Sequence, residues 1–299
     1  MLTGIHFLLT YECNYECDHC FLYCGPKSFG TFKIKQIKNT LKDAKKLKTV
    51  ETVCFEGGEP FLYYPILVEG SKIAKELGFK VGVVTNNYWA TSIEDAKIWL
   101  KPFKELGIDD FSISDDTFHY ESEENNLAKN AYIALKELKI PTSSITIDEP
   151  KIESKKERSN EKGKPIIRGT TLFKGRAVEK LTKDLPKRSW EDMNECPHED
   201  FQGLGRVHLD PFGNIHVCQG LSIGNFIKKK FSEIIRNYNP NRHPIVEPLL
   251  NGGPTELVKR FKLKHEGSYV DECHLCYMAR LALIDKYPEY LCPKQVYGL

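Results

Sequence analysis

Apolar positions in the first half of the chain alternate between short continuous runs and stretches with a helical period. Ile34, Ile37, Leu41 and Ala44 recur at three- and four-residue spacing, which indicates one apolar helix face within 31–47. The same argument predicts further helices near 63–77, 92–106 and 126–138. The short runs predict buried strands at 4–10, 51–58, 80–87, 110–116 and 143–148, with a sixth at 166–173.

Strands that alternate with helices are typical of parallel strands joined by crossovers, and therefore of an α/β sheet. Five or six such units fit a partial or complete barrel, and an open doubly wound sheet is the alternative. In both architectures ligands gather at the carboxyl ends of the strands. Unusual residues follow the strands at that edge, in the segments 11–25, 57–60, 85–87 and 115–116.

The pattern changes after the fifth predicted strand. Residues 151–164 have no apolar face, which indicates a solvated loop, a linker or a mobile lid. Residues 206–220 predict a β-hairpin that turns at 211–214, and helices are expected near 255–263 and 273–286.

The chain contains neither a long apolar stretch nor a recognisable signal peptide. No stretch approaches the roughly 18 apolar residues that span a bilayer, and residues 1–11 lack the parts of a secretory signal. A cytoplasmic protein that makes no membrane contact is therefore expected.

Charge is nearly balanced along the 299 residues, because 43 lysines and arginines face 41 aspartates and glutamates, a net charge of +2. This balance offers no broad surface for a polyanion, so nucleic-acid binding is disfavoured. The basic segment 151–164 keeps that alternative open.

Ten cysteines carry the candidate chemistry. A reducing compartment disfavours a disulfide framework, which leaves metal ligation as the better interpretation. Cys13, Cys17 and Cys20 have the spacing CxxxCxxC, and thiolates suit iron–sulfur clusters and zinc. Three thiolates on one tight loop can hold three irons of a cubane and leave the fourth open. A second group lies in the other half of the chain, formed by Cys196, Cys218, Cys273 and Cys276.

The first cysteine loop resembles the signature of the radical S-adenosylmethionine (SAM) superfamily. His19 stands in the aromatic-type position before the last cysteine, and the sequence GGEP at 57–60 resembles the motif that contacts the amino group of SAM. The resemblance covers roughly 4–175 and implies a 4Fe–4S cluster whose open iron binds SAM. It implies cofactor contacts at Gly57, Gly58, Glu59, Pro60, Thr85, Asn86, Asn87, Ser114 and Ile147.

Simpler interpretations remain for these residues. The three thiols would also suit zinc, Glu59 could support its turn instead of receiving the SAM ammonium group, and Asn86, Asn87 and Ser114 could be plain turn or cap residues. Cys24 is expected to be a free thiol beside the loop, and Cys54 a small core residue.

The second cysteine group resembles the auxiliary-cluster extension called SPASM. Cys196, Gly213-x4-Cys218 and Cys273-x2-Cys276 match its first part, but its later cysteines are missing, so the shorter Twitch form is expected. The four cysteines would then hold a second, auxiliary 4Fe–4S cluster with no open iron. A four-thiolate zinc site is the alternative, and the role of Cys292 stays open.

The resemblance implies a partial (βα)6 TIM-type barrel over 1–175, followed by a small C-terminal α+β domain, a β-hairpin plus helices, over 176–299. The implied activity is reductive cleavage of SAM to a 5′-deoxyadenosyl radical that abstracts hydrogen from a substrate. An oxidative modification of a small molecule or peptide, aided by the auxiliary cluster, is expected. A flavodoxin- or ferredoxin-type protein would donate the electron. Because the chain begins almost at its first strand, a peptide-recognition domain before it is not expected, which weakens the peptide hypothesis.

Four polar residues are candidates for substrate-side catalytic roles: Asp115, Asp116, His119 and Arg176. Cap or loop roles for the first three, and a helix-surface position for Arg176, are the alternatives. Two other functional classes also remain. One is a non-catalytic iron–sulfur electron carrier or redox sensor, and the other is a zinc-stabilised nucleic-acid-binding protein.

Overall fold

The computed structural model describes residues 1–120, 122–154 and 165–299. Its main feature is an eight-stranded sheet with the order β11-β10-β9-β1-β2-β3-β4-β5. The five predicted N-terminal strands pair parallel with their neighbours, which confirms the α/β sheet. They are β1 (Gly4–Thr10), β2 (Thr52–Gly57), β3 (Lys80–Thr85), β4 (Asp110–Ser114) and β5 (Thr142–Ile145).

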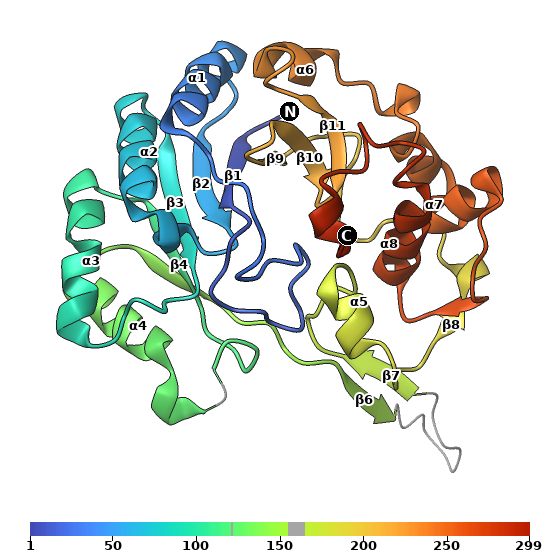
Figure 1. Ribbon diagram of the computed structural model, residues 1–299, viewed down its shortest axis with the longest axis horizontal. Helices are drawn as coiled ribbons and strands as arrows, with labels where there is room; N and C mark the ends of the chain where they lie inside the picture. The colour runs from blue at the N-terminus through green and yellow to red at the C-terminus, as the bar shows by residue number, and fades with distance from the viewer. Residues whose placement is uncertain (121, 155–164) are drawn as a thin grey trace.

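Four predicted helices connect these strands and lie side by side along one face of the sheet (Figure 1). They are α1 (Ile34–Ala44), α2 (Tyr64–Glu76), α3 (Ile93–Leu106) and α4 (Leu127–Glu137). The core lies between these two layers, where Phe7 stacks on Phe55 with ring centroids 5.4 Å apart. Gly70 of α2 lets the helix approach closely, since a Cβ there would lie 3.2 Å from the Phe55 ring. Successive strand residues point to opposite faces, so the neighbours of these phenylalanines face away from the helices.

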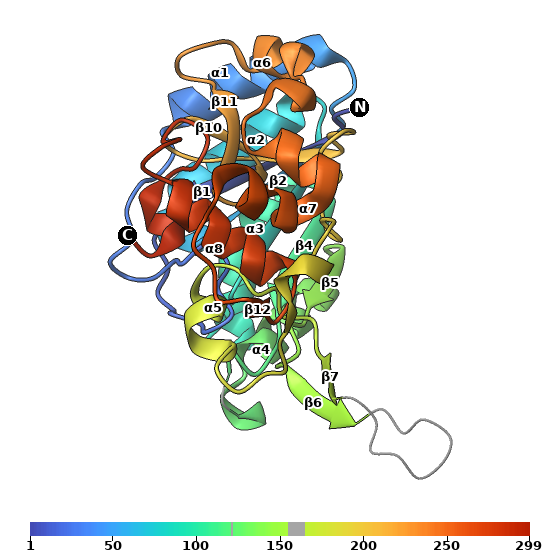
Figure 2. The same cartoon turned by 90° about the vertical axis from the view of Figure 1, so that its right-hand side faces the viewer.

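The prediction of a sixth sheet strand at 166–173 is wrong. β7 (Pro165–Arg168) pairs antiparallel with β6 (Lys151–Ser154) in a separate two-stranded sheet, seen at the bottom of Figure 2. The strand ends at Arg168, and residues 168–170 are exposed. The sixth parallel strand is instead β9 (Arg206–Leu209), which pairs with β1. Residues 155–164, most of the expected loop, linker or lid, lie outside the described residues.

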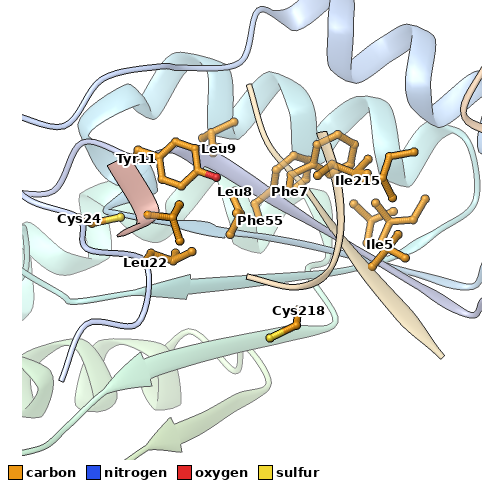
Figure 3. Close-up of a cluster of buried hydrophobic side chains, with 14 of the residues drawn as sticks. Ile5, Phe7, Leu8, Leu9, Tyr11, Leu22, Cys24, Phe55, Ile215 and Cys218 are labelled. Carbon is orange, nitrogen blue, oxygen red and sulfur yellow. The ribbon is translucent and has the colours of Figure 1, made fainter. Parts of the chain in front are cut away.

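The predicted hairpin at 206–220 is confirmed, because β10 (Asn214–Cys218) pairs antiparallel with β9. Asp210 fixes the turn, since its carboxylate accepts the backbone N–H groups of Phe212 and Asn214 at 3.0 and 2.8 Å. β11 (Leu221–Asn225), which the sequence did not predict, extends the same sheet. Figure 3 shows Ile215 of the hairpin gathered with Ile5 and Phe7 of β1.

Four further helices complete the described part of the second half: α5 (Arg176–Leu181), α6 (Phe231–Asn237), α7 (Val246–Phe261) and α8 (Glu272–Leu283). α7 begins well before the predicted residue 255 and is kinked at Gly252 and Gly253, whose backbones are not helical. The remaining short elements are β8 (Arg188–Ser189), β12 (Ser268–Tyr269) and 3₁₀ turns at Lys45–Leu47, Pro60–Tyr63, Glu123–Asn125, Trp190–Asp192, Pro240–Arg242 and Lys294–Tyr297. Within the described ranges, no helix has the length and apolar character needed to cross a membrane.

Candidate active site

The loop that follows β1, residues 11–25, holds three of the predicted metal ligands on one compact turn. Backbone N–H groups of Cys20 and Tyr23 donate to the carbonyls of Cys17 and Cys20, at 3.0 and 3.2 Å. The backbone N–H of Cys13 donates to Gly25 at 3.2 Å and closes the loop. This compact turn therefore carries all three CxxxCxxC cysteines just beyond the carboxyl end of β1. We call this segment the cysteine loop.

The thiols of this loop differ in acidity because their surroundings differ. Burial raises the pKa of Cys13 to about 12 and also raises the pKa of Cys17. A hydrogen bond from the Cys24 thiol outweighs burial at Cys20 and lowers the pKa of that thiol to about 6. Cys24 thus lies beside the loop as predicted, and it favours the thiolate form of Cys20, which is the form that binds metals.

The glycine-rich turn at 57–60 packs directly against the cysteine loop. Backbone N–H groups of Gly58 and Glu59 donate to the carbonyls of Thr10 and Glu12, at 2.7 and 2.9 Å. A Cβ at Gly58 would lie 2.1 Å from the Glu12 oxygen, and one at Gly57, with φ of 142°, would lie 2.4 Å from the Thr10 oxygen. In this structure the missing side chains admit the cysteine loop itself, a reason that the sequence did not reveal.

Glu59 is fully buried and both of its carboxylate oxygens already have partners. Oε1 accepts from the Phe61 backbone at 3.0 Å and from the Thr85 hydroxyl at 2.8 Å. Oε2 accepts from the Asn86 backbone at 2.7 Å. Burial raises the pKa of Glu59 to about 7. These contacts favour its role as a support for the turn, and they join the ends of β2 and β3.

The end of β3 places two asparagines next to the cysteine loop. The Asn86 amide nitrogen lies 3.7 Å from the Cys13 sulfur and donates to the Asn14 side chain at 2.9 Å. Asn87 adopts a left-handed backbone with φ of 62°, and its amide donates to the carbonyl of Ser114 at 2.9 Å. These contacts bring together the ends of β1, β3 and β4.

Two buried polar atoms at this edge have no hydrogen-bond partner among the described residues, Asn87 Oδ1 and His19 Nδ1. Buried polar atoms are normally paired, so such atoms need an explanation. A polar ligand at the carboxyl edge of the strands would supply the missing partners. Together with the three cysteines of the cysteine loop, these unpaired atoms fit an iron–sulfur cluster and a polar cofactor such as SAM.

The segment after β4 contributes to the same edge. Asp116 accepts from His119 Nδ1 at 2.7 Å and from the backbone of Ile147 at 3.2 Å. Burial raises the pKa of this carboxyl, but the His119 hydrogen bond outweighs it, so the pKa of Asp116 is lowered. Asp115 accepts from the Asn126 side chain at 2.7 Å. The two aspartates therefore hold the loops after β4 and β5, whereas His119 lines an open cavity with Cys17.

Arg176, the fourth candidate residue, lies against the cysteine loop. It is buried rather than on a helix surface, and its guanidinium donates to the carbonyls of Cys17 and Cys24 at 2.9 and 2.6 Å. Its own backbone N–H donates to the Cys20 carbonyl at 3.0 Å. The start of α5 thus clamps the cysteine loop through three hydrogen bonds.

The second cysteine group also converges. Cys196, Cys218, Cys273 and Cys276 line one cavity, although they come from a loop, the end of β10 and the first turns of α8. Burial raises the pKa of Cys196, Cys273 and Cys276, the last to about 11. Four thiols around one cavity fit a four-thiolate metal centre.

Two buried cations at this cavity were not predicted. Lys174 Nζ lies 3.7 Å and the Arg280 guanidinium 3.9 Å from the Cys218 sulfur. Buried charges require partners of opposite sign, which four thiolates would supply. One signal was present in the sequence, because Arg280 follows Cys276 by four residues and therefore shares its helix face.

Cys292, whose role the sequence left open, and Cys54, which was predicted to be a small core residue, lie outside these groups. Cys292 lines a separate cavity with Asn214 and Tyr290, away from the four-thiol cavity. Cys54 lies within β2 and is half-buried.

This chain matches one protein family, and parts of it match individual proteins. The family described as the Radical SAM superfamily matches residues 7–159. YydG of Bacillus subtilis, named as a peptide biosynthesis protein, is 28% identical over 119 residues, which cover 40% of this chain and 37% of that protein. An S-adenosylmethionine-dependent nucleotide dehydratase from a Thermoplasmatales archaeon is 32% identical over 110 residues, which cover 35% of this chain and 37% of that protein. The chain thus spans less than half the length of these relatives.

Among solved structures, one match is BtrN in an open conformation. The matched region covers 84% of this chain and 87% of the BtrN chain, with a TM-score of 0.49 and 14% identity. That likeness is too remote to support an argument about activity.

Proposed function

Because this chain belongs to the radical SAM superfamily, we propose that it reductively cleaves SAM to a 5′-deoxyadenosyl radical and abstracts hydrogen from a substrate. The family implies a 4Fe–4S cluster and SAM as cofactors. The observation that carries the proposal is the cysteine loop packed against the glycine turn at the carboxyl edge of parallel strands. When bound, these cofactors supply the one-electron chemistry, and the protein supplies position and shielding.

We assign Cys13, Cys17 and Cys20 as the ligands of the first cluster. Glu59 positions the glycine turn and the Asn86 backbone through its three accepted hydrogen bonds. The unpaired Asn87 Oδ1 is an acceptor suited to an ammonium group, and the unpaired His19 nitrogen suits a polar edge of the cofactor. Gly57, Gly58, Pro60, Thr85, Ser114 and Ile147 complete the proposed cofactor site.

We assign Cys196, Cys218, Cys273 and Cys276 to an auxiliary 4Fe–4S cluster in a C-terminal Twitch-like domain over 176–299. Lys174 and Arg280 would balance the charge of its thiolates. The six adjacent parallel strands, β9 and β1 to β5, would form the partial barrel. A second cluster suits an oxidative outcome, because oxidation of a substrate radical requires an electron acceptor.

The substrate class is proposed from the relatives and remains broad. One relative is named for peptide biosynthesis and another as a nucleotide dehydratase. A small molecule or a peptide is therefore the proposed substrate, and a flavodoxin- or ferredoxin-type protein the proposed electron donor. Family membership disfavours a non-catalytic electron carrier and a zinc-stabilised nucleic-acid-binding protein.

The decisive experiment is anaerobic reconstitution with iron and sulfide, followed by dithionite and SAM. Wild-type protein should form 5′-deoxyadenosine, measured by liquid chromatography and mass spectrometry, and should hold about eight iron atoms in two cubanes. Cys17→Ala should abolish the product and halve the iron, because the open-iron cluster loses a ligand. Cys276→Ala should halve the iron yet leave some SAM cleavage.

Cys54→Ala is the matched control, since Cys54 belongs to neither cysteine group, and it should keep both iron and product. If the Cys17 variant still cleaves SAM, the assignment of the first cluster is wrong. If Cys276→Ala retains the full iron content, the assignment of the auxiliary cluster is wrong, whereas the assignment of the first cluster is unaffected.

A further inference from the structure

Three side chains from three strands meet on the sheet face that points away from α1 to α4. His6 comes from β1, Glu56 from β2 and His208 from β9. Their neighbours Phe7 and Phe55 pack on the opposite, helix-covered face. We call these three residues the His–Glu–His cluster. The cysteine loop and the four-thiol cavity do not include any of them.

The polar atoms of the cluster lie close together, with Glu56 between the two histidines. His6 Nδ1 lies 3.1 Å from Glu56 Oε2, and His208 Nε2 lies 3.3 Å from Glu56 Oε1. One ligand atom from each residue falls within 4.8 Å of the other two. Ligand atoms bound about 2.0–2.2 Å from one octahedral or tetrahedral ion stand roughly 2.8–3.6 Å apart. The two nitrogen–oxygen separations, one to each oxygen of Glu56, lie within that range.

We propose that the His–Glu–His cluster binds a first-row divalent metal ion, independently of the two cysteine sites. Two imidazoles and one carboxylate form a donor set found in catalytic zinc and non-haem iron(II) sites. Three protein ligands leave at least one coordination position open.

Hydrogen bonding alone does not explain why the imidazole of His208 is buried. Its side chain is 7% exposed, and its Nδ1 has no partner within the described part of the chain. A buried polar atom without a partner destabilises the folded state, because it has lost its hydrogen bonds to water. A metal ion at Nε2 would not pair Nδ1, but it would hold the buried ring more firmly than one hydrogen bond to Glu56 does.

The exposure of the three side chains shows from which side a ligand can reach the site. The His6 and Glu56 side chains are 26% and 20% exposed, so water or a small donor can reach the cluster past them but not past His208. The free coordination position therefore suits an oxygen or nitrogen donor, either water or a polar group of a bound molecule. No thiol belongs to the cluster, which separates its chemistry from that of the cysteine sites.

Zinc is the probe for the test, added to full-length protein whose cysteine sites have first been reconstituted with iron and sulfide. X-ray absorption at the zinc edge separates nitrogen and oxygen ligands at about 2.0–2.1 Å from sulfur ligands at about 2.3 Å. About one zinc per chain with only the shorter ligands is expected. Glu56→Gln and His6→Asn should each weaken zinc binding at least tenfold in calorimetric titration.

The exposed residues Glu51 and His265 provide matched controls, because Glu51→Gln and His265→Asn remove the same chemical groups elsewhere. Both should retain zinc with wild-type affinity. His6 is partly exposed, so His6→Asn should fold even if the Glu56 variant does not, and thermal unfolding monitors this. Sulfur-dominated zinc spectra, or undiminished zinc binding in the folded His6 variant, would overturn the proposal. Neither result depends on SAM cleavage.

Discussion

At the scale of single residues, the two glycines of the GGEP turn set the distance between two chain segments. The backbone of Gly58 hydrogen-bonds the end of β1 at Thr10, and a side chain at Gly58 would collide with Glu12 of the cysteine loop. The sequence singled out this glycine for its resemblance to a cofactor motif. The structure adds a packing reason that operates whether or not the cofactor is bound.

Gly58→Ala should therefore disturb the protein even without cofactors. The added Cβ would lie 2.1 Å from the Glu12 oxygen, and overpacking of this kind costs about 1–3 kcal/mol or more. We expect a lower free energy of unfolding in urea and lower iron content of the first cluster. Gly205→Ala is the control, because a Cβ there meets open space and should change stability by less than about 0.5 kcal/mol. Equal stability of the two variants would refute this packing argument.

At the scale of elements, side chains before a helix decide how it begins. His243 precedes α7, and its Nδ1 accepts the backbone N–H groups of Ile245 and Val246 at 3.2 and 3.1 Å. Its Nε2 donates to the Ser222 carbonyl at 3.0 Å, so the imidazole must be neutral. Burial lowers the pKa of His243 below its ordinary value of about 6.5, although the Ser222 hydrogen bond opposes the shift.

This contact predicts a pH-dependent stability. Below about pH 6.5 the unfolded chain binds a proton at His243 that the folded chain resists, so the free energy of unfolding falls as pH falls. The stabilisation is fully present above about pH 6.5 and is lost as pH drops through the lower, folded-state pKa. His243→Asn keeps a cap acceptor but cannot titrate, so its stability should fall less steeply between about pH 7.5 and about pH 5. Urea unfolding across that range measures the slope. An unchanged slope would contradict the assignment, and the exposed His265→Asn should leave it unchanged.

At the scale of the whole molecule, the second half of the chain completes the first. β9 pairs with β1, and one continuous core includes Ile5 and Phe7 together with Val207 and Ile215. Arg176 adds a polar link, since it holds the cysteine loop from the start of α5. The two proposed domains, 1–175 and 176–299, therefore share one sheet. They are also joined by the hydrogen bonds between Arg176 and the cysteine loop.

Arg176→Met should loosen the cysteine loop by removing this link. Two carbonyls, of Cys17 and Cys24, would lose their partner, and each unpaired buried carbonyl costs about 1–3 kcal/mol. We expect slower reconstitution of the first cluster and faster loss of its iron in air, both measured by iron absorbance. The proposed auxiliary cluster should be retained. Arg176→Lys should be intermediate, because an ammonium group cannot reproduce the planar fork of donors. Wild-type cluster stability in the methionine variant would show that the clamp is dispensable.

The sequence by itself determined the local features of this protein. The pattern of apolar residues located the first five strands and four helices, and the cysteine spacing located the cysteine loop. Both patterns are properties of residues that are neighbours in the sequence. Only the tertiary structure decided which distant segments meet. It made β9, which pairs with β1, the sixth parallel strand in place of 166–173. It also brought Lys174 and Arg280 to the four-thiol cavity, and His6 and His208 to Glu56. Strand pairing and side-chain convergence depend on long-range register, which a hydrophobic period along one segment does not encode.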